Sequence, residues 1–361
     1  MYKRILLVSL SVLMGWIAYP AASTVCDAAQ IQGGVQDTYA VNSIESLTLR
    51  NQRTGKNLLA RVTFPVGCAD PCPVIIFSHG AGGSKDAYQY VINYWAAHGY
   101  VCVQPNHGDS INLADGKSAM AFSMMKTIKT LPSDYQLWAS RFADISCIID
   151  SLPIIQQQIP TRMDQNEIAC GGHSLGAFTT AVIGGATVPQ ASRTSGSLQD
   201  ARVKVLLMMS PQGLRHCAKD FGFDDKNSWT NIHLPSLFIT GTEDGTQWTP
   251  AAQRRISYDC SPPGNKFLAI IEGASHMTFA GVNLNRSALN SGRPRPLRDL
   301  LVRRMREKLP SETGNHVDML QDIQVVTTTF LDAYLKNNQA DRRELCQQPE
   351  VFGPLVAIEC K

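Results

Sequence analysis

The sequence predicts an α/β fold in which a mostly parallel sheet is covered by helices on both faces. Three observations predict it. From about residue 73 onward, short strand-like runs alternate with longer helical segments, which is typical of a parallel sheet. Runs such as PVIIF (73–77) are continuously apolar, as in strands buried on both faces. The 361 residues are 44% hydrophobic and 17% charged, a globular composition with material for a large core.

The expected elements follow one another in a regular order. Before residue 73, two β-rich runs separated by the polar turn RTGKN predict antiparallel strands within residues 46–64. Trp138, Phe142 and Ile145 begin an apolar stripe at helical spacing, and Pro153 is expected to end that helix. The remaining strands are expected at 73–77, 100–105, 167–172, 203–209, 236–240 and 266–271. The helices are expected at 87–98, from the S-x-x-Q capping box at 133–136 to residue 152, at 175–183 and at 316–335.

The first 23 residues have the layout of a secretory signal peptide. Lys3 and Arg4 precede an apolar run over residues 5–17, and Ala21-Ala22-Ser23 fits the small-x-small cleavage rule. A 13-residue apolar run is short for crossing a bilayer, so cleavage is favoured over a membrane anchor. We therefore expect export to the periplasm or the medium without stable membrane insertion, and a single domain over residues 24–361. The net charge of +3 gives no support to nucleic-acid binding.

The chain holds ten cysteines, all after the signal segment. Export and an even count together favour disulfides. The expected pairs are Cys68 with Cys72, Cys346 with Cys360 and Cys217 with Cys260. A zinc site at the first pair is disfavoured because no second Cys/His pair stands at ligand spacing, and no metal is expected. Three cysteines in apolar surroundings are interpreted as buried thiols: Cys102, Cys147 and Cys170.

The heptapeptide GGHSLGA (171–177) carries the clearest chemical signal. Its G-x-S-x-G pattern puts Ser174 on a tight turn between an expected strand and an expected helix, as a nucleophile elbow requires. A serine nucleophile needs a base and an acid, which follow it in the order Asp then His in such folds. Asp244 stands just past the end of one later strand and His276 just past the end of the next, so both should lie at the carboxyl edge of the sheet. Glu243 is the alternative acid, and Asp244 is preferred because Gly245 lets the loop turn inward.

Donors for a developing oxyanion are expected from two places. One is the backbone N–H of Leu175 at the start of the helix after the serine. The other is the glycine-rich loop FSHGAGG (77–83), where the N–H of Ala81 is our first choice and that of Gly80 our second. His79 and His173 are interpreted as structural residues that shape these turns.

These motifs resemble the serine α/β-hydrolase superfamily over roughly residues 73–335. HGAGG, GHSLGA, GTEDG and GASHMTF stand in the order of that superfamily, and residues 77–110 are similar to the oxyanion-loop region of acetylhydrolase-like members. Within it the chain resembles bacterial exported hydrolases related to dienelactone hydrolases, platelet-activating-factor acetylhydrolases and cutinase-like polyester hydrolases. Dienelactone hydrolases use a cysteine nucleophile, and this chain has Ser174 there.

The resemblance implies an α/β-hydrolase fold and an exported serine hydrolase that cleaves carboxylic esters, small or polymeric, without a cofactor. The alternatives are an acyltransferase or peptidase with the same triad, and a non-enzymatic binding protein on the same scaffold. Trp248 could wall the substrate pocket, although ordinary packing explains it equally well. The segment 281–314 is a candidate flank of the active site, with eight basic and two acidic residues within 286–308, although a solvated loop is the simpler interpretation. Oligomeric state and chain-length preference have no signature in the sequence.

Overall fold

The computed structural model describes most of the chain after residue 37. Several sequence-based expectations fall outside the described residues and stay predictions: the signal peptide (1–23), Trp248 and the basic segment 286–308. Cys217 also lies outside them, but Cys260 is a free thiol, so the expected Cys217–Cys260 bond is wrong for this structure. The described residues all belong to one unit, Asp37–Lys361. They are 38–110, 135–188, 198–214, 223, 226–246, 249–282, 315–347 and 349–361.

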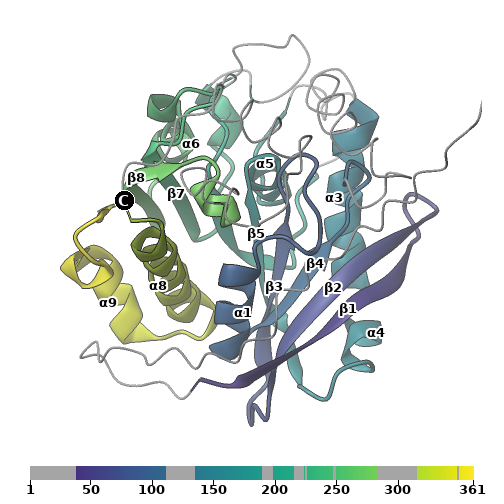
Figure 1. Ribbon diagram of the computed structural model, residues 1–361. Coiled ribbons are helices and arrows are strands. Elements are labelled where there is room, and N and C mark those ends of the chain that lie inside the picture. The colour runs from purple at the N-terminus through teal and green to yellow at the C-terminus, as the bar shows by residue number, and fades with distance from the viewer. Residues whose placement is uncertain are drawn as a thin grey trace, which may run out of the picture. The chain divides into compact units, whose positions relative to one another are not determined.

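A nine-stranded sheet forms the centre of this unit, in the order β1-β2-β4-β3-β5-β6-β7-β8-β9. The six central strands, from β4 to β8, pair in parallel, whereas β1, β2 and β9 join the two edges antiparallel. Figure 1 shows β1 and β2 in purple at one edge and the yellow C-terminal segment at the other. The strands are β1 (Ala40–Asn51), β2 (Lys56–Val66), β3 (Cys72–Ser78), β4 (Val101–Pro105), β5 (Met163–His173), β6 (Val203–Met209), β7 (Ser236–Glu243), β8 (Lys266–Ser275) and β9 (Val356–Cys360).

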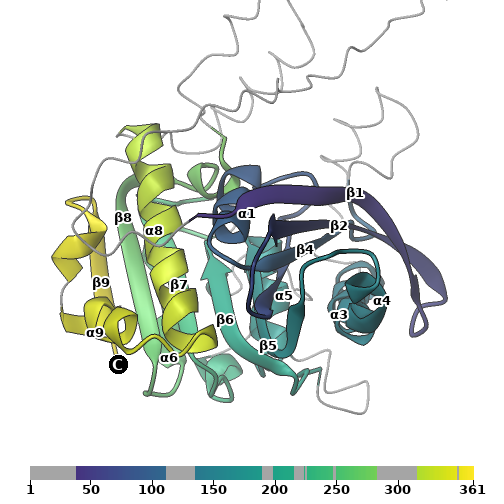
Figure 2. The same ribbon diagram turned by 90° about the horizontal axis from the view of Figure 1, so that it is seen from below.

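Helices cover both faces of the sheet. On one face pack α3, α4, α5 and α6, and on the other pack α1, α8 and α9. Figure 2 shows α8 lying along β7 and β8. The α-helices are α1 (Gln89–Ala97), α3 (Tyr135–Asp150), α4 (Leu152–Gln156), α5 (Leu175–Ile183), α6 (Ile256–Cys260), α8 (His316–Leu335) and α9 (Gln339–Gln347), and the 3₁₀ turns are η4 (Lys226–Trp229), η5 (Ala251–Gln253), η6 (Thr278–Ala280) and η8 (Pro349–Phe352).

The continuous apolar runs are explained by this two-sided burial. In β3, Val74 and Ile76 belong to the core on the α3/α5 face, and Ile75 and Phe77 belong to the core on the α1/α8 face. Successive side chains of a strand point to opposite faces, so a strand covered on both sides must be apolar at every position. The structure therefore has the predicted α/β-hydrolase fold class, with a mostly parallel sheet, helices on both faces and antiparallel N-terminal strands.

Two local expectations need correction. The helix with the apolar stripe ends at Asp150 rather than at Pro153, and Pro153 instead lies in the first turn of α4. Proline is tolerated there because the N–H groups of a first turn have no partner within the helix. Helix α9 and the edge strand β9 were not predicted from the sequence. No helix of the described residues is long and apolar enough to cross a membrane.

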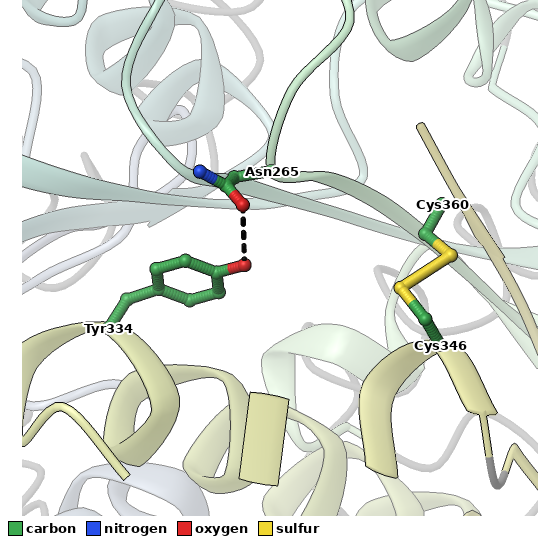
Figure 3. The surroundings of a disulfide bond; sticks show 4 residues. All are labelled: Asn265, Tyr334, Cys346 and Cys360. Carbon is green, nitrogen blue, oxygen red and sulfur yellow. Dashed lines mark hydrogen bonds between the residues drawn. A yellow bond between two sulfur atoms is a disulfide. The ribbon is translucent and has the colours of Figure 1, made fainter. Parts of the chain in front are cut away.

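The predicted Cys346–Cys360 disulfide forms and ties α9 to β9, with the two Cα atoms 6.1 Å apart (Figure 3). Nearby, Tyr334 of α8 donates a hydrogen bond to the side chain of Asn265, just before β8. The predicted Cys68–Cys72 bond is wrong for this structure: both are free thiols, with sulfur atoms 2.9 Å apart, beyond the covalent S–S length of about 2.05 Å. Cys102, Cys147 and Cys170 are buried free thiols, as expected.

Candidate active site

Ser174 lies on the sharp turn between β5 and α5. Its backbone has φ 55° and ψ −116°, a conformation that non-glycine residues rarely adopt. The turn is held from the neighbouring strand, because the N–H of Ser174 donates to the carbonyl of Met209 at the end of β6 over 3.0 Å. The serine side chain is only partly buried, so the strained turn presents a hydroxyl at the carboxyl edge of the sheet.

Close backbone contacts explain the two glycines of the motif. A Cβ atom at Gly172 would lie 2.4 Å from the backbone carbon of Gly176, and a Cβ at Gly176 would lie 1.9 Å from the carbonyl oxygen of Ser78. Real Cβ atoms are essentially never found within 3.0 Å of other heavy atoms. The G-x-S-x-G spacing therefore lets the strand, the turn and the end of β3 pack closely enough to form the elbow.

The structure brings Ser174, His276 and Asp244 together. His276 follows β8, and its Nε2 lies 3.0 Å from the Oγ of Ser174. Its Nδ1 lies 2.8 Å from Oδ1 of Asp244, which follows β7, and the other carboxylate oxygen accepts from the hydroxyl of Thr240 over 2.8 Å. Asp244, not the neighbouring Glu243, therefore contacts the imidazole. A carboxylate only accepts hydrogen bonds, so Nδ1 carries the proton and Nε2 is free to accept one from the serine.

Arg254 is a buried cation beside this trio, and the sequence did not reveal it. The residue follows η5, is 1% exposed, and donates from Nε to the carbonyl of Asp244 and from Nη1 to the carbonyls of Ser210 and Pro211. Its Nε also lies 3.4 Å from Oδ1 of Asp244, and its Nη2 lies 3.2 Å from Nδ1 of His276. The guanidinium thus fixes the loop that carries the acid and places positive charge next to the imidazole.

The pKa values of His276 and Asp244 are both lowered, but for different reasons. Burial lowers the pKa of His276 below 6.5, and Arg254 lowers it further, against the opposing effect of the hydrogen bond that His276 donates to Asp244. For Asp244, burial by itself would raise the pKa, but the Arg254 charge and the hydrogen bond from His276 outweigh it and lower the pKa. Near neutral pH the site therefore combines an ionised carboxylate with a neutral imidazole, the protonation state of a general base.

The glycine-rich loop after β3 leaves one of three neighbouring N–H groups available. Gly80 donates its N–H to the hydroxyl of Tyr88 over 2.9 Å, and Gly82 donates to the carboxylate of Asp109 over 3.0 Å. Between them, the N–H of Ala81 has no acceptor in the described part of the chain. The N–H of Leu175, in the first turn of α5, is likewise free of a described acceptor. These are the two N–H groups for which the sequence suggested the role of oxyanion donor, a role that stays a prediction, and the N–H of Gly80 is engaged elsewhere.

A chain of hydrogen bonds joins the glycine-rich loop after β3 to the loop that carries His276. The hydroxyl of Tyr88 lies 3.0 Å from Nδ1 of His173, and Nε2 of His173 lies 3.0 Å from the carbonyl oxygen of His276. A carbonyl only accepts, so His173 donates from Nε2 and accepts from Tyr88 at Nδ1. Burial, with the neighbouring His276, holds the pKa of His173 well below 6.5, which keeps the ring neutral. His173 is therefore a structural link, as the sequence indicated.

A second Ser–His–Asp set lies at the end of β3, directly before the glycine-rich loop, and the sequence did not predict it. The hydroxyl of Ser78 lies 2.9 Å from Nε2 of His107, and Nδ1 of His107 lies 2.9 Å from the carboxylate of Asp144. Ser78 and His107 are 0% exposed, so no substrate can reach this hydroxyl. Burial raises the pKa of Asp144 to about 7. Exposure and the strained turn, rather than hydrogen-bond pattern alone, distinguish Ser174 as the candidate nucleophile.

Comparison with known proteins gives one family match. Residues 30–130 match the model of platelet-activating factor acetylhydrolase, isoform II, a stretch that includes the loop of Ala81 and ends before Ser174. A solved structure from Klebsiella pneumoniae subsp. pneumoniae MGH 78578, provisionally assigned as a dienelactone hydrolase, aligns with a TM-score of 0.48 and 13% identity, over 67% of this chain and 90% of that one. No curated protein matches. By its fold and by the family match over part of its length, the chain resembles the α/β-hydrolase superfamily, and the match indicates a hydrolase.

Proposed function

We propose that the protein is a serine hydrolase that cleaves carboxylic esters through an acyl-enzyme intermediate. The observation that carries the proposal is the continuous contact from a partly exposed serine through a neutral imidazole to a buried carboxylate, with distances of 3.0 and 2.8 Å. Hydrogen bonds of this length are the geometry that general-base activation of a serine requires.

In the first half of the reaction, the Oγ of Ser174 attacks the ester carbonyl carbon while its proton passes to Nε2 of His276. The negative charge that develops on the carbonyl oxygen is stabilised by the N–H groups of Ala81 and Leu175. The tetrahedral intermediate collapses when the bond to the alcohol oxygen breaks, and His276 gives its proton to that oxygen. The alcohol leaves, and the acyl group stays on Ser174.

In the second half, water attacks the acyl carbon and gives a proton to His276. The second tetrahedral intermediate breaks its bond to Ser174, whose oxygen regains the proton as the carboxylic acid departs. Asp244 stabilises the imidazolium in both halves, and Arg254 holds the loop that carries Asp244. No step needs a metal or an organic cofactor. An ester, small or polymeric, is the proposed partner, and the periplasm or the medium is the proposed location.

The proposal predicts that Ser174→Ala abolishes hydrolysis of p-nitrophenyl acetate while the fold is kept. Loss of a nucleophile removes covalent catalysis, and kcat should fall by about 10⁴-fold or more. Initial rates and circular dichroism spectra of the purified variant and the wild type check this. The control is Ser146→Ala on α3, which removes only a hydrogen bond to Asp200 and should keep full activity.

Two outcomes would contradict the proposal. Full activity of a folded Ser174→Ala variant would exclude the serine mechanism. Absence of ester hydrolysis by the wild type, together with acyl transfer to added alcohols or amines or with peptide cleavage, would keep the nucleophile and reassign the reaction.

A further inference from the structure

A buried arginine on α3 reaches into the loop that carries Ala81. Arg141 is 0% exposed, and its guanidinium donates from Nη1 to the carbonyl oxygen of His79 over 2.7 Å and from Nη2 to that of Gly80 over 3.2 Å. The Gly80 oxygen also accepts from the N–H of Gly83 over 3.0 Å and from Nδ1 of His79 over 2.7 Å. Two successive carbonyl groups of the loop therefore face the same cation.

The direction of these carbonyls fixes the direction of the next N–H groups. In a trans peptide, the C=O of one residue and the N–H of the following residue point opposite ways, and no cis peptide occurs in the described chain. The His79 carbonyl faces Arg141, and the N–H of Gly80 in the same peptide points away, to the hydroxyl of Tyr88. By the same rule, the N–H of Ala81 points away from Arg141 because the Gly80 carbonyl is held there.

Arg141 is itself held rigidly by Asp109. Its Nε and Nη2 donate to the two carboxylate oxygens over 3.0 and 2.7 Å, in the two-pronged geometry that a guanidinium forms with a carboxylate. Both side chains are 0% exposed. One carboxylate oxygen also accepts the N–H of Gly82, so the pair grips the loop on both sides of Ala81. Burial alone would raise the pKa of Asp109, but Arg141 outweighs it and lowers the pKa, which keeps the carboxylate ionised.

We infer that Arg141 is a positioning residue for the oxyanion hole. It acts through the Gly80–Ala81 peptide, whose N–H it holds in the orientation that binds the developing oxyanion before any substrate arrives. Preorganised donors of this kind are effective because they need no reorientation during the reaction. The inference rests on the proposed function, since it assigns Arg141 to the donor that the proposed ester hydrolysis would use.

The test compares an ester with its thionoester, in which sulfur replaces the carbonyl oxygen. Sulfur accepts hydrogen bonds weakly, so the ratio of the two rates reports on the oxyanion donors. The substitution Arg141→Met should lower kcat for the ester by about 10²-fold, as expected for loss of one donor, with much less effect on KM. The ester-to-thionoester ratio should fall by about tenfold or more, because the thionoester gains little from that donor. Arg141→Lys keeps one charged donor and should lie between the wild type and Arg141→Met.

The matched control is Arg202→Met. Arg202 also pairs with aspartates, Asp200 and Asp150. It differs in that it directly precedes β6, at the amino ends of the parallel strands and away from the candidate site, and is 43% exposed. This variant should keep the wild-type rates and ratio. A wild-type ratio in folded Arg141→Met, or in Arg141→Lys if only that variant folds, would overturn the inference even if the rates fall. Loss of the cooperative fold in both variants would also overturn it, by assigning Arg141 to stability alone. Failure of the proposed function is separate, because it appears as an inactive wild type or an active Ser174→Ala.

Discussion

At the scale of single residues, buried charges set the chemistry of the site. Arg254 contacts both the carboxylate and the imidazole of the trio, and Arg141 holds the loop with the free N–H of Ala81. A buried cation is costly unless hydrogen bonds and an opposite charge satisfy it, and both arginines meet that condition. These contacts compensate for the loss of hydration of the two guanidinium groups. They also hold loop backbones in a geometry that apolar side chains could not fix.

The pH dependence of the proposed ester hydrolysis should follow from the environment of His276. The imidazole must be neutral to accept the serine proton, so kcat/KM should rise with pH through the pKa of His276 in the free enzyme. Burial and Arg254 lower that pKa, so the midpoint should lie below 6.5. Arg254→Met removes one lowering influence, and its midpoint should move to higher pH. Rate measurements with p-nitrophenyl acetate from about pH 4 to about pH 9 check both values.

A neighbouring arginine provides the control for this experiment. Arg255 is 41% exposed and pairs with Asp259 and Glu359 at the surface, so Arg255→Met should leave the midpoint in place. A wild-type midpoint at or above 6.5, or an unchanged midpoint in folded Arg254→Met, would contradict the proposed electrostatic role of the guanidinium.

The sequence predicted some of these residues and not others, for physical reasons. Three residues of the site could be predicted because each follows the end of a strand-like apolar run, in a short loop: Ser174, Asp244 and His276. Arg141 stands four residues before Ile145, on the apolar face of its helix, and a charge on such a face was an available signal of a buried partner. Arg254 had no such signal, because its partners come from segments 10, 22 and 44 residues away and only the fold brings them together.

At the scale of elements, the strand–turn–helix unit around Ser174 depends on close packing. Gly176 lies in α5 without a positive φ, so alanine there would suit the helix, yet its Cβ would lie 1.9 Å from the carbonyl oxygen of Ser78. Gly176→Ala should therefore lower the free energy of unfolding by about 3 kcal/mol and reduce activity, since the elbow must move away from β3. Chemical denaturation followed by circular dichroism measures the change.

Gly55→Ala separates the effect of close packing from that of backbone conformation. Gly55 has φ +68°, and its Cβ would meet nothing within 4 Å, so only conformational strain of about 1 kcal/mol is expected. An equal or smaller loss of stability in Gly176→Ala than in Gly55→Ala would contradict the packing explanation.

The elements themselves were largely predictable because the central strands are buried on both faces. The central strands of the structure end within a few residues of the bounds predicted from their apolar runs. For β6 (Val203–Met209) the two sets of bounds are the same. The edge strand β9 was missed although its sequence VAIEC begins with a short apolar run, because a run of this length is not specific to a strand. Only its pairing with β8 makes it a strand, and that pairing depends on where the chain returns after α9.

At the scale of the whole described unit, parallel strands gather the loops of the candidate site at their carboxyl ends. The loops after β3, β5, β7 and β8 carry Ala81, Ser174, Asp244 and His276, and all leave the carboxyl ends of parallel strands. At the far side of the sheet, the Cys346–Cys360 bond fastens the last strand to α9. The alternation of strands and helices in the sequence was enough to predict this convergence, although not the buried charges that hold it.

The most direct test of the central claim is the site of reaction with a fluorophosphonate. Such a reagent phosphonylates a serine that an adjacent imidazole activates. Intact-mass measurement and peptide mapping of the treated wild type should find a single adduct, located on Ser174, and none on Ser78 despite its own His–Asp partners. An unlabelled but folded protein, or an adduct on any residue other than Ser174, would contradict the account.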